Sequence, residues 1–359
     1  MKLLITTLLI TTTLLGHAQV DTSASNITIS GYGEIYYTYD FAQPEDHNRP
    51  SFIYSHNRSN EVNLNLGFIK ANYTTDRVRG NLALAAGTYM NANYAAESGV
   101  LKNIYEANMG FKLSASKNLW VDAGVFGSHI GFESAVSKDC RALTRSILAD
   151  NSPYYESGAK VTYIPDNGKW LLSGLLLNGW QHIQRPDGNQ TLALGTQIMY
   201  TPSAKVTLNY STFIGNDKPS DAKQMRYFHN LYGIFTLTDK FQTTLGFDFG
   251  MEQQASGSTD FYNWYSPVLI LRYSLNDRWA IAGRAELYHD KNGVIIATGT
   301  ENGFQTTGYS LNLDWQLHTN AVWRLEGRIL NSKDDIFTNA DGDPTNTNTF
   351  VTTSMAFSF

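Results

Sequence analysis

Cysteine is almost absent from this 359-residue sequence, since Cys140 is the only one. A single cysteine excludes any disulfide within the chain. The eight histidines form no cluster with Cys, Asp or Glu at zinc-ligand spacing. We therefore expect no structural metal, and nothing in the sequence indicates a cofactor.

Long apolar runs and charge are also scarce. The longest apolar run after the first residues, "LLSGLLLNGW", is interrupted by Gly174 and closed by Asn178, far short of the roughly 20 residues of a transmembrane helix. Charged residues make up only 16% of the chain, yet the mean hydropathy is -0.29. A barrel with an apolar outside and a polar inside has this composition. The net charge of -5 argues against a nucleic-acid partner.

Residues 1–18 have the pattern of a secretory signal peptide. Lys2 is followed by an apolar stretch from Leu3 to Leu15 and by small residues up to Ala18. The alternative, a retained membrane anchor, is disfavoured because about 13 apolar residues cannot span a bilayer. The pattern predicts export to the periplasm and a mature barrel domain over residues 19–359.

The remainder alternates between short and long polar connections. Seven short turns lie near Asp76, Lys117, Asn167, Ser203, Asp239, Asp277 and Asn320. Eight longer loops cover about 42–60, 95–102, 133–152, 184–190, 216–225, 253–260, 290–303 and 331–347. Fifteen connections imply about sixteen strands. The fold class predicted is all-β, a closed antiparallel transmembrane β-barrel with short periplasmic turns and long external loops.

Several short turns are followed by an aromatic residue, as expected at a membrane interface: Trp120, Trp170, Phe241, Trp279 and Trp323.

Alternation within the strands supports the barrel, because a charge facing lipid near the midplane costs roughly 2 to 4 kcal/mol. In "YEANMGFKL", one face holds Tyr105, Met109 and Phe111, and the other holds Glu106 and Lys112. Two strands fit less well. Lys70 is ambiguous because "VNLNLGFIKANY" changes phase, which a bulge or a rim position would explain. The seventh strand, "WLLSGLLLNGW", has no polar face; it faces a partner subunit or an inward-folded loop.

In each predicted strand, the residues that alternate with the apolar, lipid-facing ones point into the barrel. These inward positions hold eight acids and six bases, which we assign to the pore lining. They are Glu34, Glu106, Asp122, Glu156, Asp248, Glu286, Asp314 and Glu326, with Lys112, Lys160, Arg272, Arg284, Arg324 and Arg328. Because charged rings set ion preference, this small imbalance predicts a weak cation preference.

The 133–152 loop is the candidate constriction loop, because the third long loop of known sixteen-stranded barrels folds inward. Its charged residues are Lys138, Asp139, Arg141, Arg145 and Asp150. One hypothesis is that Arg141 and Arg145 face acids across the constriction; the alternative is that these charges only solvate an external loop. The stretch "CRALTRSILA" is a candidate short helix, and Cys140 is expected to be a small buried residue.

The sequence ends on "TTSMAFSF", an alternating strand with Phe359 at its end. Such a strand must pair with the first one to remove both sheet edges. Outer-membrane barrels typically end in this way, and Phe359 is the candidate signal for the barrel-insertion machinery.

No catalytic residues are predicted. Asp290 follows His289, but adjacent strand residues point to opposite faces. Asp341 and Asp343 lack the spacing of a calcium loop, which favours a plain turn. The sequence therefore indicates a protein that is not an enzyme.

Three stretches resemble the OmpL-like β-barrel porin-2 family of outer-membrane proteins: "SGYGEIYYTYDF", "NRSNEVNLNLGFIKANY", and "NSPYYESGAKVTY" with "LLLNGWQHI". The resemblance implies a porin-like channel in a Gram-negative outer membrane. Its partners would be outer-membrane lipid, small hydrophilic solutes and, in an oligomer, copies of itself. The alternative function is a closed barrel that acts as a surface adhesin or scaffold without transport.

Overall fold

The computed structural model describes residues 26–359. The predicted signal peptide, residues 1–18, lies outside the described residues. Among those described, no helix is long and apolar enough to cross a membrane.

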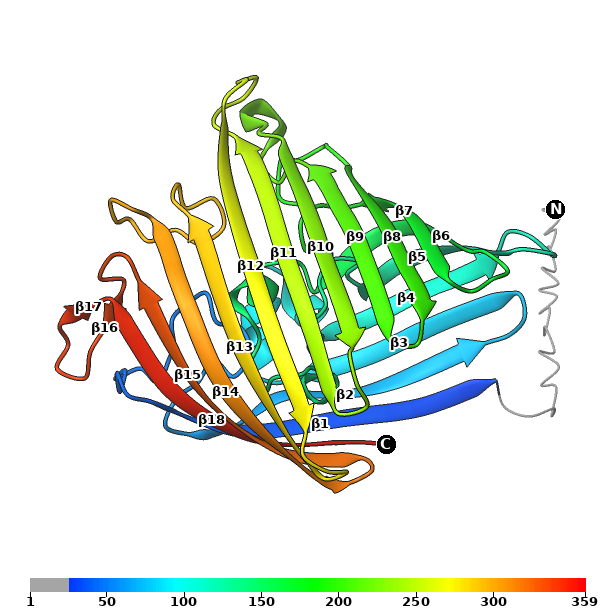
Figure 1. Cartoon of the computed structure of the whole chain (residues 1–359). Helices are drawn as coiled ribbons and strands as arrows, with labels where there is room; N and C mark the ends of the chain where they lie inside the picture. The colour runs from blue at the N-terminus through cyan, green and yellow to red at the C-terminus, as the bar shows by residue number, and fades with distance from the viewer. Residues whose placement is uncertain (1–25) are drawn as a thin grey trace, which may run out of the picture.

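Sixteen antiparallel strands of the described chain close into one barrel (Figure 1). Each strand pairs with its neighbours in sequence, and β18 closes the barrel between β15 and β1. The barrel strands are β1 (Ile27–Asp40), β2 (Val62–Thr74), β3 (Val78–Ala86), β4 (Ile104–Lys112), β5 (Asn118–Gly127), β6 (Tyr155–Ile164), β7 (Trp170–Leu177), β8 (Ala193–Ser203), β9 (Val206–Gly215), β10 (Arg226–Thr236), β11 (Phe241–Gln253), β12 (Phe261–Ser274), β13 (Trp279–Asp290), β14 (Phe304–His318), β15 (Ala321–Ser332) and β18 (Thr347–Ser358). The predicted strand number and closed topology are confirmed.

Eight long loops alternate with seven short turns, as predicted. We name the loops L1 to L8; they cover 41–61, 87–103, 128–154, 178–192, 216–225, 254–260, 291–303 and 333–346. Their secondary structure is short: α1 (Thr88–Asn93), η1 (Gly99–Asn103), η2 (Ser137–Asp139), α2 (Ile147–Asp150), η3 (Ser220–Ala222), and a hairpin of β16 (Phe337–Thr338) and β17 (Pro344–Thr345). Of the stretch "CRALTRSILA", where a short helix was expected, only residues 147–149 are helical, as the first three residues of α2.

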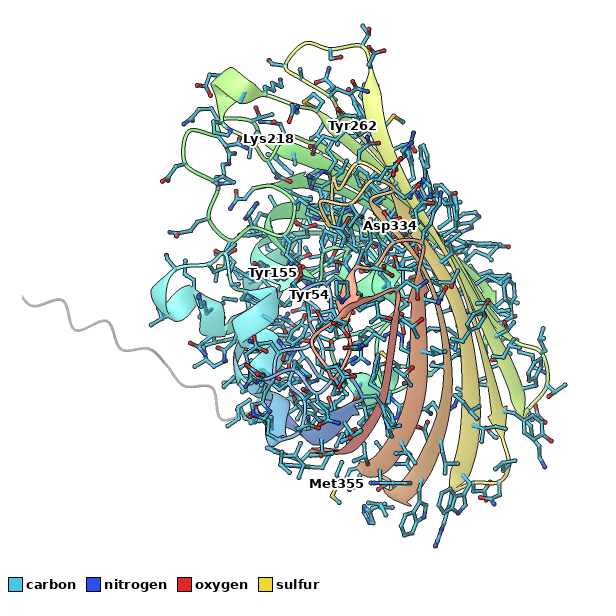
Figure 2. All side chains as sticks on the ribbon, turned by 90° about the vertical axis from the view of Figure 1, so that its left-hand side faces the viewer. Tyr54, Tyr155, Lys218, Tyr262, Asp334 and Met355 are labelled. Carbon is cyan, nitrogen blue, oxygen red and sulfur yellow. The ribbon has the colours of Figure 1, made fainter. Side chains whose placement is uncertain are left out.

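Apolar side chains face outward along the strands, while polar ones turn inward. On β14, Leu311 is 67% exposed on the outer face, whereas its neighbour Asn312 is buried inside. Trp279 stacks on Trp315 on the outer face near the short turns, with ring centroids 5.3 Å apart. Figure 2 shows the outward Met355 at the rim of the barrel wall and Tyr155 within its interior.

Two aromatic residues depart from their predicted positions. Tyr105 was expected to face lipid, but a register shift between β3 and β4 leaves it as an extra residue, and it packs inward against Phe68. Trp120 was expected at the membrane interface, but it is buried and Arg79 lies 4.4 Å above its ring. A bulge therefore overrides the parity at Tyr105. Trp120 follows the parity, because it lies on the same inward face as Asp122, and a cation–π contact rather than the membrane interface takes its ring.

The two strands that fitted the parity poorly are now oriented. A bulge at Asn65 shifts the register of β2 against β1, and Lys70 bonds Glu106 on the lumen side, 2.7 Å away. On β7, Leu175 and Leu177 are buried inward in an apolar cluster. The seventh strand needs no polar inner face, because loops cover it.

The seam between the first and last strands is closed by backbone and side-chain packing. The backbone N–H groups of Gly31 and Phe359 donate to each other's carbonyl oxygens at 3.0 Å. The Phe359 ring lies over Gly31 so closely that a Cβ atom there would meet ring carbon at 2.4 Å. An aromatic residue covering a strand glycine pins the register at this seam.

A charge on the outer face should destabilise the barrel. We expect Leu311→Arg to lower the free energy of unfolding by about 2 to 4 kcal/mol, because Leu311 lies midway along a lipid-facing row. Gln197→Arg is the control, since Gln197 is half-buried on the inner face of β8. Equal losses for both variants, in urea titrations of the protein refolded into vesicles, would contradict the assigned faces.

Candidate functional site: the lumen and its inward-folded loop

L3 folds into the barrel and contacts the wall on β1, on β9 and β10, and on β12 to β15. Its first residues run along β9 and β10, where the His129 carbonyl accepts from Ser211 Oγ at 2.7 Å and the Gly131 N–H donates to Asn230 at 3.1 Å. The loop then reaches β1, where Ser137 contacts Tyr32 at 3.0 Å. Its second half follows β15, β14, β13 and β12.

The wall behind the second half of L3 is a network of ion pairs. On β13 and β15, Arg284 bonds Glu326 at 2.9 Å, and Arg328 bonds Glu286. On β14, Asp314 accepts from Arg324 at 2.7 Å and from Arg272 of β12. All six predicted pore-lining residues of β13 to β15 belong to this network, and five of them are covered by L3.

The same side chains bind the backbone of L3. The guanidinium groups donate to loop carbonyls: Arg324 to Ser137 and Cys140, Arg272 to Arg141, Arg284 to Thr144, and Arg328 to Arg145. The carboxylates accept loop N–H groups, Glu326 from Thr144 and Glu286 from Ile147, both at 2.7 Å. Buried backbone groups need such partners. We name this set of contacts the L3 latch.

The hypothesis of arginines facing acids across a constriction is wrong for Arg145. Its guanidinium is fully buried and donates to the carbonyls of Ser134, Ala135 and Leu143 within its own loop. Arg141 is half-buried and lies near Arg272, a base rather than an acid. Arg145 thus holds the shape of L3.

The other predicted residues of L3 are of two kinds: Lys138 and Asp139 are partly exposed, whereas Asp150 and Cys140 are buried. Lys138 and Asp139 form a loose pair at 3.9 Å, with the Asp139 side chain 58% exposed. Asp150 is buried at the C-terminal end of α2, where desolvation raises the pKa of its carboxyl to about 7. Cys140 is buried, as predicted.

Glu34 joins four parts of the chain at one point. Its carboxylate contacts His56 of L1 at 3.1 Å and Asn65 of β2 at 2.9 Å, and it accepts from Ser137 of L3. Glu34 is therefore fixed beneath the loops instead of being open to the lumen. Glu156 and Asp248, also predicted to line the pore, are fully enclosed beneath loops.

The inner face of β2 to β6 carries a different set of charges that L3 leaves partly open. Lys70 pairs with Glu106, and Arg79 of β3 pairs with Asp122 of β5. Lys160 lies 4.6 Å from the Phe126 ring, and Lys112 is half-buried at the end of β4. Arg79 was missed, although the alternation of "VRGNLALAA" places it on the inner face with Asn81.

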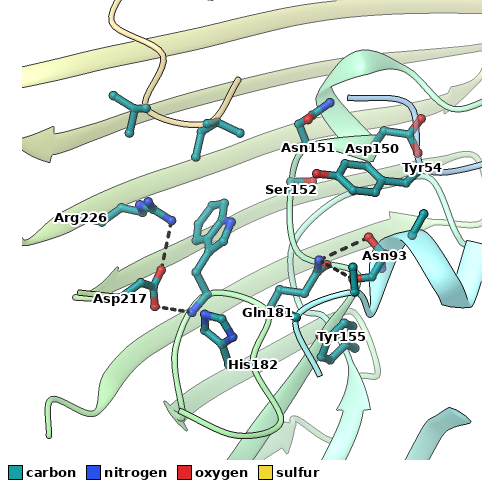
Figure 3. Close-up of a pocket in the computed structure, with 16 residues that line it drawn as sticks. Tyr54, Asn93, Asp150, Asn151, Ser152, Tyr155, Gln181, His182, Asp217 and Arg226 are labelled. Atoms are coloured by element: carbon teal, nitrogen blue, oxygen red, sulfur yellow. Dashed lines mark hydrogen bonds and ion pairs between the residues drawn. The ribbon is translucent and has the colours of Figure 1, made fainter. Parts of the chain in front are cut away.

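Two cavities lie on opposite sides of L3. The outer one, of about 420 Å³, is lined by loops including Tyr54, Asp150 and Trp180. Figure 3 shows Asp217 bridging Arg226 and the loop that carries His182 at one end of this cavity. The inner one, of about 370 Å³, opens near the short turns and is lined by residues of β12, β14 and β15 together with Lys138.

The weaker sequence candidates have structural roles. Asp290 caps L7 by accepting from the backbone N–H groups of residues 294, 295 and 296, while His289 stacks on Tyr265 on the other face. Asp341 and Asp343 donate backbone N–H groups to Asn339 in the exposed β16–β17 hairpin. Within residues 26–359, no group of three His, Cys, Asp or Glu side chains could hold a metal.

The family model described as "beta-barrel porin-2, OmpL-like" matches residues 26–359. The chain belongs to this porin family. It is accordingly an outer-membrane β-barrel of the porin class, a channel for passive diffusion of small hydrophilic solutes or ions.

The fold of this porin is also found in solved outer-membrane structures. The anion-selective porin from Comamonas acidovorans is similar with a TM-score of 0.61 and 8% identity over 93% of this chain and 99% of that one. OmpT of Vibrio cholerae has a TM-score of 0.60 and 10% identity over 94% and 99%. The channel DcaP of Acinetobacter baumannii has a TM-score of 0.60 and 10% identity over 93% and 97%. At these identities the likeness shows the fold alone. No curated protein sequence matches the chain.

Breaking the L3 latch should release the loop. We expect Glu326→Ala to expose L3 to trypsin at Arg141 and Arg145, because Thr144 loses its acceptor and Arg284 loses the closest of its three ion pairs. Mass spectrometry of the digested, membrane-embedded protein would locate the cuts.

Asp166→Ala is the matched control, because it removes the exposed pair between Lys117 and Asp166, which lie on two different short turns. If the Glu326 variant is folded and cut no faster at L3 than the control, the latch does not hold the loop.

Proposed function

We propose that solutes cross this porin between L3 and the inner face of β2 to β9. Two parts of the barrel wall differ in how far loops bury their inward-facing side chains. Most inward side chains of β12 to β15 are buried beneath L3 and L1, except at the inner cavity, where Arg272 and Gln316 are half-exposed. On β2 to β9, inward residues such as Asn72, Asn81, Lys112 and Gln197 stay half-exposed. This difference in exposure carries the proposal, because a water-filled path keeps its lining side chains wet.

L3 is the narrowing element of this path. It separates the outer cavity, which its residues 150–152 help to line, from the inner cavity beside Lys138. Because the L3 latch binds its backbone at several points, the loop is a fixed constriction and its release would widen the pore.

A closed barrel remains the second candidate, and one observation favours it. Two apolar clusters fill much of the outer half of the interior, with Phe52, Phe304 and Trp264 in one and Tyr89, Tyr94 and Tyr155 in the other. A barrel plugged by its loops would present L1 to L8 as a binding surface without transport.

Conductance distinguishes the two functions. We expect discrete current steps from the purified protein in a planar bilayer. Gln197→Trp should lower the step size, because the side chain points into the half-exposed sector, whereas Thr196→Trp on the outer face of the same strand should not. A heat-modifiable, folded barrel without steps would favour the closed barrel.

Two proposals follow from the ends of the sequence and concern delivery. Residues 1–18 act as a signal peptide for export to the periplasm, supported by the apolar stretch after Lys2. Phe359 acts as the insertion signal, supported by its exposed ring on the outer face of the last strand. Both place the mature barrel in the outer membrane by way of the periplasm.

Copies of the chain associate through the face formed by β3 to β7. These strands have only 8 to 10 residues, whereas β10 to β15 have 11 to 15. A spanning β-strand needs about 9 to 11 residues, so β7, with 8 residues, is below this range and β3 to β6 lie at its lower end. A wall this short is relieved of its mismatch with the bilayer by oligomerisation. One of the solved OmpT structures of Vibrio cholerae is a trimer form.

Bulk added to this face should break the oligomer. Gly174 on β7 and Gly327 on β15 both face outward into open space. We expect Gly174→Trp to shift the protein to monomers on unheated gels and in native mass spectrometry, while Gly327→Trp keeps the wild-type pattern. A monomeric wild type, or the same oligomer for both variants, would contradict the proposed face.

A further inference from the structure

The charged side chains that water can reach inside the barrel are not the same set as the charged residues predicted from the alternation to point inward. Of the eight predicted acids, Glu34, Glu286 and Glu326 are buried against loops, and Glu156 and Asp248 are enclosed. Water reaches a half-exposed or exposed set on the inner wall and on the underside of L3. This set has seven bases and two acids: Lys70, Arg79, Lys112, Lys138, Arg141, Lys160 and Arg272, with Glu106 and Asp139.

Including the buried partners of these groups does not remove the excess. Asp122 neutralises Arg79, and Asp314 lies between Arg272 and Arg324. With those three added, the inner half of the pore has eight bases against four acids. The excess is therefore four positive charges, although the whole chain has a net charge of -5.

The rim on the same side is also basic. The seven short turns carry six bases and four acids: Arg77, Lys117, Lys169, Lys205, Lys240 and Arg278, with Asp76, Asp166, Asp239 and Asp277. Short turns of such barrels face the periplasm. Positive charge therefore extends from the underside of L3 to the periplasmic mouth.

The outer cavity opposes this field only weakly. Asp217 and Glu252 share Arg226, at 3.1 Å and 2.7 Å, and Lys218 also pairs with Glu252, so this cluster is neutral as a whole. Asp150 is buried, and its raised pKa of about 7 keeps part of its population uncharged near neutral pH.

From this distribution we propose that the channel prefers small anions, and that the basic inner wall below L3 sets the preference. This inference rests on the proposed path along β2 to β9. Rings of Lys and Arg side chains favour anions in pores, and a cleft lined by one sign of charge concentrates the opposite ion. The weak cation preference expected from counting inward residues is thereby replaced, because burial removes more acids than bases from the water-filled path.

The test is the reversal potential of single channels in a KCl gradient, with wild-type protein in a planar bilayer. We expect a Cl⁻ to K⁺ permeability ratio above one. The double variant Lys112→Glu with Lys138→Glu should lower this ratio at least about threefold, because the pore field acts exponentially on ion concentration. Lys205→Glu on a short turn is the control with a smaller effect, since its side chain is exposed outside the lumen.

Salt supplies a second readout. Near 0.1 M the Debye length is about 10 Å and near 1 M about 3 Å, so the preference should weaken at high salt. Steps with cation preference, or an unchanged ratio in the double variant, would overturn the inference and leave the channel standing. A folded barrel without steps would overturn both the channel and its anion preference.

Discussion

The interior of this barrel depends on the ion pairs that link β12 to β15. Arg284, Glu326, Arg328 and Glu286 alternate across two strands, and each also bonds L3. A loop without regular structure carries backbone groups that need partners when it is buried. Charged side chains of the wall provide these partners, so L3 can lie inside the barrel although its regular structure is limited to η2 and α2.

The buried charges of β12 to β15 hold L3 in position, whereas the charges on the opposite wall remain available to interact with solutes. Buried ion pairs contribute little net stability after desolvation, yet breaking one is costly. In this porin the pairs behind L3 fix where the loop lies, and the loop in turn decides which wall sector stays wet. The charges along β2 to β6 are then free to act on ions because L3 is held on the opposite side.

The sequence was sufficient for the architecture, and the reasons are physical. Lipid requires closed sheets and apolar outer faces, so alternation and turn spacing predicted sixteen strands and the closing strand at Phe359. Bulges were the limit of this reasoning: Tyr105 turned inward because one extra residue in β4 shifts the parity. Arg79 was missed although the same alternation puts it on the inner face with Asn81, and its pairing with Asp122 of β5 depends on strand neighbours that no local pattern specifies.

The lumen was harder to predict because burial inside it is decided by loops. Parity places Glu34 and Lys112 on the same inner face, yet only Glu34 meets His56 of L1 and Ser137 of L3. Those contacts join residues 22 and 103 positions apart, which no local pattern encodes. The prediction for Arg145 failed for the same reason. In the sequence, an arginine that binds carbonyl groups of its own loop cannot be distinguished from one that faces a pore.

The division of charge along the barrel axis gives the porin a direction. Mobile ions gather at the end of the pore that carries fixed charge of the opposite sign, and in this barrel the wetted bases lie between L3 and the short turns. An applied voltage fills or empties that reservoir according to its polarity. From the proposed charge distribution we expect the pore to behave as a weak rectifier, in which the same solute meets less resistance in one direction across the membrane than in the other.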